Sequence, residues 1–263
     1  MSTGEMMSWW VSASALYVML AVILFSLLNY FKGDCLCRWL SALQQFSSTK
    51  PAVKLEEVKK QLFVGLGRER SHDPLLRERG AIRILEIGVG TGVGSNFTYY
   101  PPDSRLVVVD PNPNFARYYH AHKESSATFA AKGERMDMVP DNSVDAVVMT
   151  LVLCTIDDPG RILQQIIRVL CRWLGPLGGK FYFFEHIREF DGERHRLRQK
   201  LQDLLTTTGI APYFLEGCCL NKDMLPAIGA AGFSKVSAER FYAPIDNFVY
   251  QLVKPCLRGV AEK

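Results

Sequence analysis

The sequence lacks the features that mark several large protein classes. Its 263 residues carry 31 Lys and Arg against 27 Asp and Glu, a formal net charge of only +4 with no dense basic stripe. A nucleic-acid-binding protein normally concentrates Lys and Arg on one face, so this balance gives no support to that class. The absence of an internal repeat or low-complexity tract excludes a collagen and a coiled coil. With 48% hydrophobic residues the chain can bury a sizeable core, which excludes global disorder.

Closely spaced cysteine pairs of the metal-binding kind are also missing. The seven cysteines, an odd number, are spread along the chain with no C-x-x-C spacing. This pattern is typical neither of a disulfide framework nor of a zinc site. We therefore expect no metal ligands, and reduced thiols that face the cytosol. Cys154, Cys218 and Cys219 are expected to be small buried residues.

One long segment has no charge at all. No charged residue lies between Glu5 and Lys32, and Ser14–Leu28 reads SALYVMLAVILFSLL. Roughly 20 apolar residues at ~1.5 Å each span a hydrocarbon layer of ~30 Å. The segment lacks the basic start and small-residue cleavage site of a signal peptide, and a buried core helix is the other alternative. The sequence predicts an uncleaved N-terminal membrane-anchor helix that contacts lipid through Met6–Phe31.

Basic residues follow this segment, whereas only Glu5 precedes it. The positive-inside rule then places the rest of the chain on the cytoplasmic side. The expected organisation is an anchor at residues 1–32, a linker at 33–71 and a larger domain at 72–263. Within the linker, Lys54–Leu66 has apolar residues at helical spacing and predicts an amphipathic helix. That helix would either dock on the larger domain or lie on the membrane surface.

From about Gly80 the pattern alternates between strands and helices. Short apolar runs predict strands at Ala81–Ile87, Arg105–Val109, Val144–Thr150 and Lys180–Phe184. Between the last two, Pro159–Leu170 has helical periodicity behind an Asp-Pro start. Such alternation predicts an α/β domain with a mostly parallel sheet covered by helices on both faces. Ligands bind such sheets at the carboxyl ends of the strands.

A glycine motif follows the first predicted strand. It reads Glu86-Ile-Gly88-Val-Gly90-Thr-Gly92, and glycines let the backbone approach a ligand closely. The dinucleotide fingerprint G-x-G-x-x-G fails in both registers, because Val93 and Ser95 occupy the sixth positions. The E-x-G-x-G-x-G motif instead resembles motif I of the class I S-adenosylmethionine-dependent methyltransferases, which implies that Glu86, Gly88, Gly90 and Gly92 bind that cofactor.

A carboxylate stands at the end of the second predicted strand. Asp110 lies twenty positions beyond Gly90, followed by Pro111. It can accept hydrogen bonds from both hydroxyls of a ribose. On its own it would equally be a turn residue before a proline. The resemblance implies that Asp110 and Pro111 contact the cofactor, that Gly133 and Glu134 lie near its adenine, and that Thr150 and Leu151 border its methionine end.

Further strings resemble one family within this superfamily, the methyltransferase-like 7 proteins. They are YPP at 100–102, VDPNPNF at 109–115, LVLC at 151–154, FYFFEH at 181–186, EGCCL at 216–220 and API at 243–245. The resemblance covers roughly Lys54 to Lys263. It implies a Rossmann-like class I methyltransferase fold, S-adenosylmethionine as cofactor, S-methylation of small aliphatic thiols, and residence on endoplasmic reticulum and lipid-droplet membranes. Val93–Ser95 and Cys171–Leu177 depart from the family pattern, and both differences could reshape the rim of the pocket.

The candidate general base is His186, at the end of the fourth predicted strand. A free thiol with a pKa of ~8.5 is only a few per cent thiolate at neutral pH, so a base helps. A structural histidine held by hydrogen bonds is an equally good interpretation. Two other functions stay open on the sequence: O- or C-methylation of a lipid or quinone, and a non-catalytic platform. No nucleic-acid or obligate protein partner is expected.

Overall fold

The structure is a computed structural model, and it describes residues 17, 19–21, 24, 49–89, 96–112, 127–172, 178–215, 217–245 and 248–263. The chain divides into two units, Met1–Ser47 and Ser48–Lys263. Within the first unit, the described residues 17, 19–21 and 24 are helical and exposed. Of the described residues, none forms a helix with the length and apolar character needed to span a bilayer. The rest of the predicted membrane segment Met6–Phe31 lies outside them.

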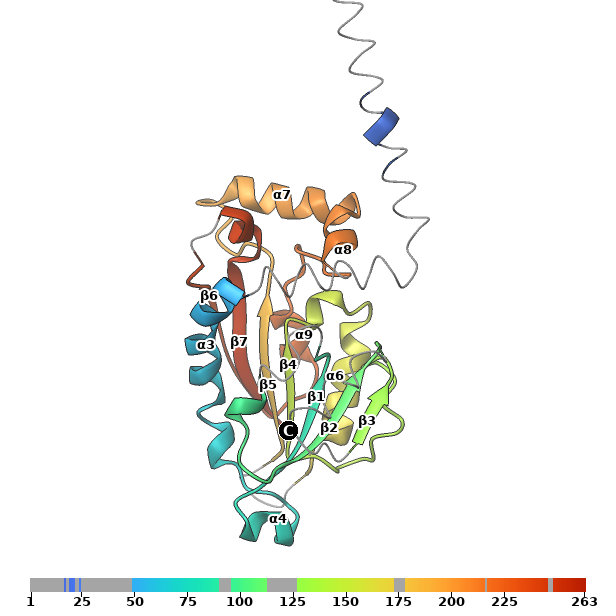
Figure 1. Ribbon diagram of the computed structural model, residues 1–263, viewed down its shortest axis with the longest axis vertical. Coiled ribbons are helices and arrows are strands. Elements are labelled where there is room, and N and C mark those ends of the chain that lie inside the picture. Colours follow the sequence, from blue (N-terminus) through green and yellow to red (C-terminus); the bar gives the residue numbers. More distant parts are fainter. Residues whose placement is uncertain are drawn as a thin grey trace, which may run out of the picture. The chain divides into compact units, whose positions relative to one another are not determined.

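The second unit is built on a seven-stranded sheet with the order β3-β2-β1-β4-β5-β7-β6 (Figure 1). The strands are β1 (Arg83–Ile87), β2 (Arg105–Asp110), β3 (Ala127–Ala130), β4 (Ala146–Thr150), β5 (Lys180–His186), β6 (Lys235–Tyr242) and β7 (Pro255–Glu262). The pairings from β3 through to β5 are parallel, whereas β7 runs antiparallel to both β5 and β6. This confirms the predicted mostly parallel α/β sheet. The four predicted strands are present, and the antiparallel edge was not predicted.

Both faces of the sheet are buried. Along β1, Leu85 packs into one hydrophobic core and Ile84 into the other, as expected when successive side chains point to opposite faces. Helices α6 (Pro159–Val169) and α9 (Leu225–Ala230) cover the first face. Helix α3 (Thr49–Phe63) covers the second (Figure 1). Because neither face meets water, the central strands are continuous apolar runs.

The start of helix α6 is fixed by a capping carboxylate and a proline. The Asp158 side chain accepts a hydrogen bond from the backbone N–H of Arg161 at 3.0 Å, and Pro159 occupies the first turn. An N-cap carboxylate satisfies one of the unpaired amides at the helix start, and proline has no amide to satisfy there. The predicted helix is confirmed, ending one residue earlier than expected.

Helix α3 packs against the sheet. Val58, Leu62 and Phe63 are buried in the second core, where the Phe63 ring lies 6.3 Å from that of Tyr182 on β5. The helix begins at Thr49 and ends at Phe63, and a 3-10 turn follows at Leu66–Arg68. Of the two expected roles for this amphipathic helix, docking is the one observed.

The remaining helices are short or lie at the ends of the sheet. They are α4 (Pro74–Glu78), α7 (Arg196–Thr207), α8 (Ile210–Phe214) and the 3-10 turns η2 (Phe97–Tyr99), η4 (Leu153–Thr155) and η5 (Phe248–Val253). Helix α7 lies across the end of the sheet opposite α4 (Figure 1). Helix α7 therefore stands at the end where β5 finishes, the end at which ligands are expected.

Candidate functional site at the carboxyl edge of the sheet

The glycine turn begins at Gly88, directly after β1. Gly88 has φ +69°, a region that favours glycine, and its N–H donates to the Val109 carbonyl on β2 at 2.9 Å. A Cβ atom here would lie 2.5 Å from Cγ2 of Val152, which follows β4. The turn therefore brings three strand ends together with room for glycine only. Gly90 and Gly92, the other two predicted glycines, lie outside the described residues.

Asp110 ends β2 beside this turn. Its Oδ2 accepts the Val89 amide at 2.9 Å, and its Oδ1 accepts the Asn112 amide at 2.8 Å. The carboxylate is 5% exposed, so these bonds fix its direction. Acceptance of ribose hydroxyls by this carboxylate stays a prediction. Pro111, exposed at the start of the next loop, lies at this same edge.

Glu86 is buried beneath the turn, where it holds the segment that follows. Its Oε1 accepts from Asn96 Nδ2 at 2.9 Å, and its Oε2 accepts from the Tyr100 hydroxyl at 2.7 Å. Burial raises the pKa of Glu86, while Tyr100 and Asn96 oppose the rise. Its carboxylate therefore fixes the side chains of Asn96 and Tyr100. Contact between Glu86 and a cofactor stays a prediction.

The Asn96 amide also bridges to the end of β4, because it donates to Thr150 Oγ1 at 3.0 Å. The next residue, Leu151, has φ +59° and is 41% exposed. A leucine in the left-handed region is strained, and such strain gathers at functional sites. The Leu151 amide is held by the Phe184 carbonyl at 2.7 Å. Thr150 and Leu151 thus lie at the carboxyl end of β4, and their contact with the methionine end of the cofactor stays a prediction.

Gly133 and Glu134 lie on the other side of the turn. A Cβ at Gly133 would lie 2.6 Å from Cδ1 of Ile162 on α6 and 3.0 Å from Cγ2 of Ile87, so close packing requires glycine. Glu134 lines a surface pocket of about 740 Å³. The pocket is formed by the segment after β3 and the start of α6, with Asp158 and Arg161 among its lining residues. Contact of Gly133 and Glu134 with the adenine stays a prediction.

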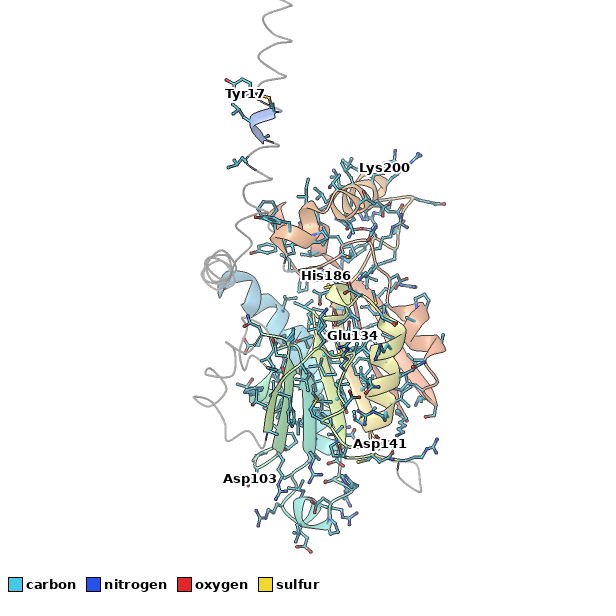
Figure 2. All side chains as sticks on the ribbon, turned by 90° about the vertical axis from the view of Figure 1, so that its right-hand side faces the viewer. Tyr17, Asp103, Glu134, Asp141, His186 and Lys200 are labelled. Atoms are coloured by element: carbon cyan, nitrogen blue, oxygen red, sulfur yellow. The ribbon has the colours of Figure 1, made fainter. Side chains whose placement is uncertain are left out.

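Figure 2 shows His186 toward the end of the molecule that carries α7, far from Asp103 and Asp141 at the opposite end. Asp103 and Asp141 lie in loops that lead into β2 and β4. His186, the last residue of β5, therefore lies at the carboxyl edge as predicted. Its Nε2 contacts the Cys218 sulfur at 2.5 Å. Burial lowers the pKa of His186, but Cys154 and Glu185 more than offset this, and the pKa is raised.

Two cysteines complete a cluster that the sequence did not reveal. The sulfurs of Cys154 and Cys218 and a ring nitrogen of His186 all lie within 4.8 Å of one another. Both cysteines are buried as expected, yet they are not scattered core residues. Contact with Cys218, together with burial, raises the pKa of the Cys154 thiol. Because the three residues lie 32 or 64 positions apart in the sequence, no local motif indicated that they would meet.

Glu185 lies directly behind this cluster. Its side chain is fully buried, and Oε1 accepts the Val152 amide at 3.0 Å. Among the described residues, Oε2 is buried without a hydrogen-bond partner. Burial raises the pKa of Glu185 to about 7, although the amides of Val152, Leu153 and Cys154 oppose the rise.

A second cluster, His72, Asp145 and Cys171, lies at the amino edge of the sheet. Asp145 accepts from Ser71 Oγ at 2.7 Å, and its oxygens also accept the amides of His72 and Arg83. Burial raises the pKa of the Cys171 thiol to about 12, which makes it unreactive. Asp145 is therefore a structural residue at the start of β4.

Comparison with known proteins gives a consistent picture. The family described as a methyltransferase domain matches residues 85–173. The chain is 36% identical over 190 residues to the thiol S-methyltransferase TMT1A of Homo sapiens, covering 70% of this chain and 72% of that protein. It is 32% identical over 216 residues to the human thiol S-methyltransferase TMT1B, covering 80% of each.

A solved structure supports the fold. The chain is similar, with a TM-score of 0.53, to the Haloferax volcanii methyltransferase determined in complex with the Trm112 methyltransferase activator. The likeness covers 85% of this chain and 96% of that one at 14% identity. At that identity the likeness speaks for the fold alone.

Proposed function

Because the chain belongs to the thiol S-methyltransferase family of the class I S-adenosylmethionine-dependent methyltransferases, we propose that it methylates a small aliphatic thiol while anchored to a membrane. The chain is a methyltransferase that uses S-adenosylmethionine. The observation that carries the choice of substrate is the identity of 32–36% to relatives named for this activity, over most of their length. O- or C-methylation of a lipid or quinone is the alternative acceptor class.

The residues at the carboxyl edge fit S-adenosylmethionine. Gly88 makes a tight turn at the end of β1 that no larger residue fits, and Asp110 presents a fixed carboxylate at the end of β2. Asp110 would accept from the ribose hydroxyls, Glu134 would border the adenine, and Thr150 and Leu151 would border the methionine end. When bound, the cofactor supplies a methyl group already activated by its sulfonium. The protein's main task is then to hold the acceptor sulfur in line with that methyl group.

The anchor and the membrane are part of the same proposal. The uncharged run between Glu5 and Lys32 supports an anchor, and the basic residues after it support a cytosolic catalytic unit. We propose the endoplasmic reticulum and lipid droplets as the membranes. A fluorescent fusion of the full chain would be imaged against markers of both. A uniformly cytosolic signal would contradict this part of the proposal.

Transfer of labelled methyl from S-adenosylmethionine to an alkyl thiol, a phenol and a quinol tests the acceptor class. The full chain would be assayed in detergent beside Asp110→Ala and the matched control Glu78→Ala, an exposed carboxylate at the other end of the sheet. We expect label on the thiol with the native chain and Glu78→Ala, and at least a tenfold loss with Asp110→Ala. Label on the phenol or quinol alone would sink the thiol proposal. Equal transfer by Asp110→Ala would refute the site assignment.

A further inference from the structure

We propose that Cys154, His186 and Cys218 bind one zinc ion, and that the acceptor thiol is its fourth ligand. The inference rests on the proposed thiol S-methylation and names how the protein would activate the sulfur. The three ligand atoms lie within 4.8 Å of one another. They come from η4, from the last residue of β5 and from the segment after α8. Only the folded chain brings them together.

The spacing of the three atoms suits a small cation. Zinc bonds to sulfur at about 2.3 Å and to imidazole nitrogen at about 2.0 Å, so tetrahedral ligand atoms stand roughly 3.3–3.8 Å apart. The three atoms all lie within 4.8 Å of one another, and His186 Nε2 and Cys218 Sγ are 2.5 Å apart. The separation that zinc requires lies between these two values. Shifts of about 1 Å in side-chain positions would therefore bring all three onto one ion.

The donor set also selects the metal. Thiolate and imidazole favour zinc over magnesium or calcium, which prefer oxygen ligands. Two cysteines and one histidine leave a tetrahedral ion with one open position, the pattern of catalytic rather than structural zinc. A substrate with a thiol group is a fitting occupant of that position, because a metal-bound thiol loses its proton readily.

The backbone holds the ligands in place. The Cys219 amide donates to the Cys154 carbonyl at 3.1 Å, which ties the segment after α8 to η4. The Ile187 amide, directly after His186, donates to the Pro255 carbonyl of β7 at 2.9 Å. Cys154 and Cys218 are 0% and 3% exposed. The three side chains are thus presented by fixed segments, as a metal site requires.

Glu185 joins the end of β5 to η4 beside the cluster. Its carboxylate is 0% exposed, and one oxygen is without a hydrogen-bond partner among the described residues. It acts electrostatically on both Cys154 and His186. Burying a carboxylate is costly unless an opposite charge or enough donors compensate it. The Val152 amide supplies part of this compensation, and through it Glu185 fixes the start of η4 beside the end of β5.

The cluster is also well placed for methyl transfer. Val152, which borders Gly88, lies two residues before Cys154 on the same turn. A thiol bound at the open position would release its proton to water and become a thiolate. Its sulfur lone pair would then form a bond to the methyl carbon, while the old carbon–sulfur bond breaks and its electrons return to the sulfonium sulfur. A neutral thioether and a neutral by-product result, and the thioether leaves because it is a weaker ligand than a thiolate.

The competing cluster at the amino edge does not meet these conditions. A single nitrogen, His72 Nδ1, contacts both Asp145 and Cys171, at 2.7 Å and 3.0 Å. The Asp145 oxygens already accept from backbone and hydroxyl donors. That group is therefore satisfied without an ion.

Metal content and a cobalt spectrum test the proposal without relying on turnover. The full chain would be purified in detergent with zinc present, beside Cys154→Ser, Cys218→Ala and the matched control Cys219→Ala. We expect about one zinc per chain in the native protein and in Cys219→Ala, and at least a tenfold weaker affinity in the other two. Circular dichroism and S-adenosylmethionine binding would verify that each variant is folded. With cobalt in place of zinc, adding an alkyl thiol should change the sulfur-to-cobalt absorption band, whereas the matching alcohol should not.

The outcomes separate this inference from the proposed function. Native protein without metal under zinc-replete conditions, or full thiol methylation after complete chelation, would overturn the metal site. Metal binding with no spectral response to the thiol would overturn the role of the substrate as ligand. A cobalt spectrum that responds to the thiol, with no methyl transfer to it, would uphold the site and refute thiol methylation.

Discussion

At the scale of single residues, the site depends on side chains that are fixed before any ligand arrives. Asp110 is held by two backbone amides, and Gly88 is held by the Val109 carbonyl and by the bulk of Val152. Such groups need little reorganisation when a ligand binds, which favours affinity. The strained backbone at Leu151 belongs to the same edge.

Gly88→Ala should damage both cofactor binding and stability. The new Cβ would combine an unfavourable positive φ with a 2.5 Å approach to Val152. We expect a loss of about 1–3 kcal/mol in the free energy of unfolding and at least a tenfold weaker cofactor affinity. Urea unfolding and calorimetric titration measure the two effects.

Gly80→Ala is the matched control for this change. Gly80 has a similar φ of +66°, but nothing lies within 4 Å of its Cβ position. Gly80→Ala should lower the free energy of unfolding by about 1 kcal/mol, the cost of the positive φ alone, and should leave cofactor affinity unchanged. Equal effects of the two substitutions would mean that the contact with Val152 plays no part.

At the scale of secondary-structure elements, side-chain contacts hold helices α3 and α7 in place on the sheet. Helix α3 is attached through its apolar stripe, and α7 is attached through Glu189, which follows β5. The Glu189 carboxylate accepts from Arg198 on α7 at 2.6 Å and from the Tyr242 hydroxyl on β6 at 2.7 Å. These contacts set where the helices stand over the sheet.

Phe63→Ala should loosen α3 from the domain. Phe63 is 3% exposed, and its ring packs against Tyr99, Tyr100 and Tyr182. Removing it leaves a cavity and should cost about 3–4 kcal/mol in the free energy of unfolding. The neighbouring Val64, which is 55% exposed, provides the control. Val64→Ala should change the free energy of unfolding by less than ~0.5 kcal/mol. Comparable losses in urea unfolding would contradict the docking of α3.

Glu189 should make the fold sensitive to acid. Burial raises the pKa of Glu189, but hydrogen bonds from Tyr242, the Asp191 amide and Arg198 outweigh it, and the pKa is lowered. A lowered folded-state pKa means that the stabilisation is present above the unfolded value of ~4.3 and is lost as pH falls through the folded value. Glu189→Gln should cost about 3 kcal/mol at neutral pH, and should flatten the loss of stability on acidification. An unchanged pH profile of urea unfolding would exclude this role.

At the scale of the whole molecule, the end of the chain completes the sheet. Strand β7 lies between β5 and β6 (Figure 1), although it is the last strand in the sequence. Gly259 in β7 would place a Cβ 2.5 Å from the Ser237 carbonyl and 2.6 Å from Phe183. The sheet is therefore finished only after Pro255–Glu262 has been synthesised.

Deleting residues 1–31 should separate membrane attachment from the catalytic unit. Both hydrophobic cores lie within Ser48–Lys263, so we expect the shortened chain to unfold cooperatively with little change in free energy. It should move from the membrane pellet to the supernatant after alkaline extraction, and keep methyl transfer to a water-soluble thiol. A shortened chain that stays in the pellet would show that the main membrane contact lies elsewhere, for example at the exposed Leu197 of α7.

The sequence by itself determined what depends on neighbours along the chain. The apolar run of β1, the Asp158 cap of α6 and the glycine turn after Glu86 are local, because each needs only residues a few positions apart. The sequence could also place Asp110 at a strand end, since strand lengths fix such positions. The parallel core of the fold and most of the predicted cofactor edge follow from these signals.

Only the tertiary structure decided which distant residues meet. Cys154, His186 and Cys218 carry no local signal, and their contact exists because β4, β5 and the segment after α8 end at one edge of the sheet. The same holds for the pairing of β7 with β5 and β6, which no short window could indicate. Contacts of this kind are set by packing the elements into one core, and the chemistry proposed at the cysteine cluster depends on that packing.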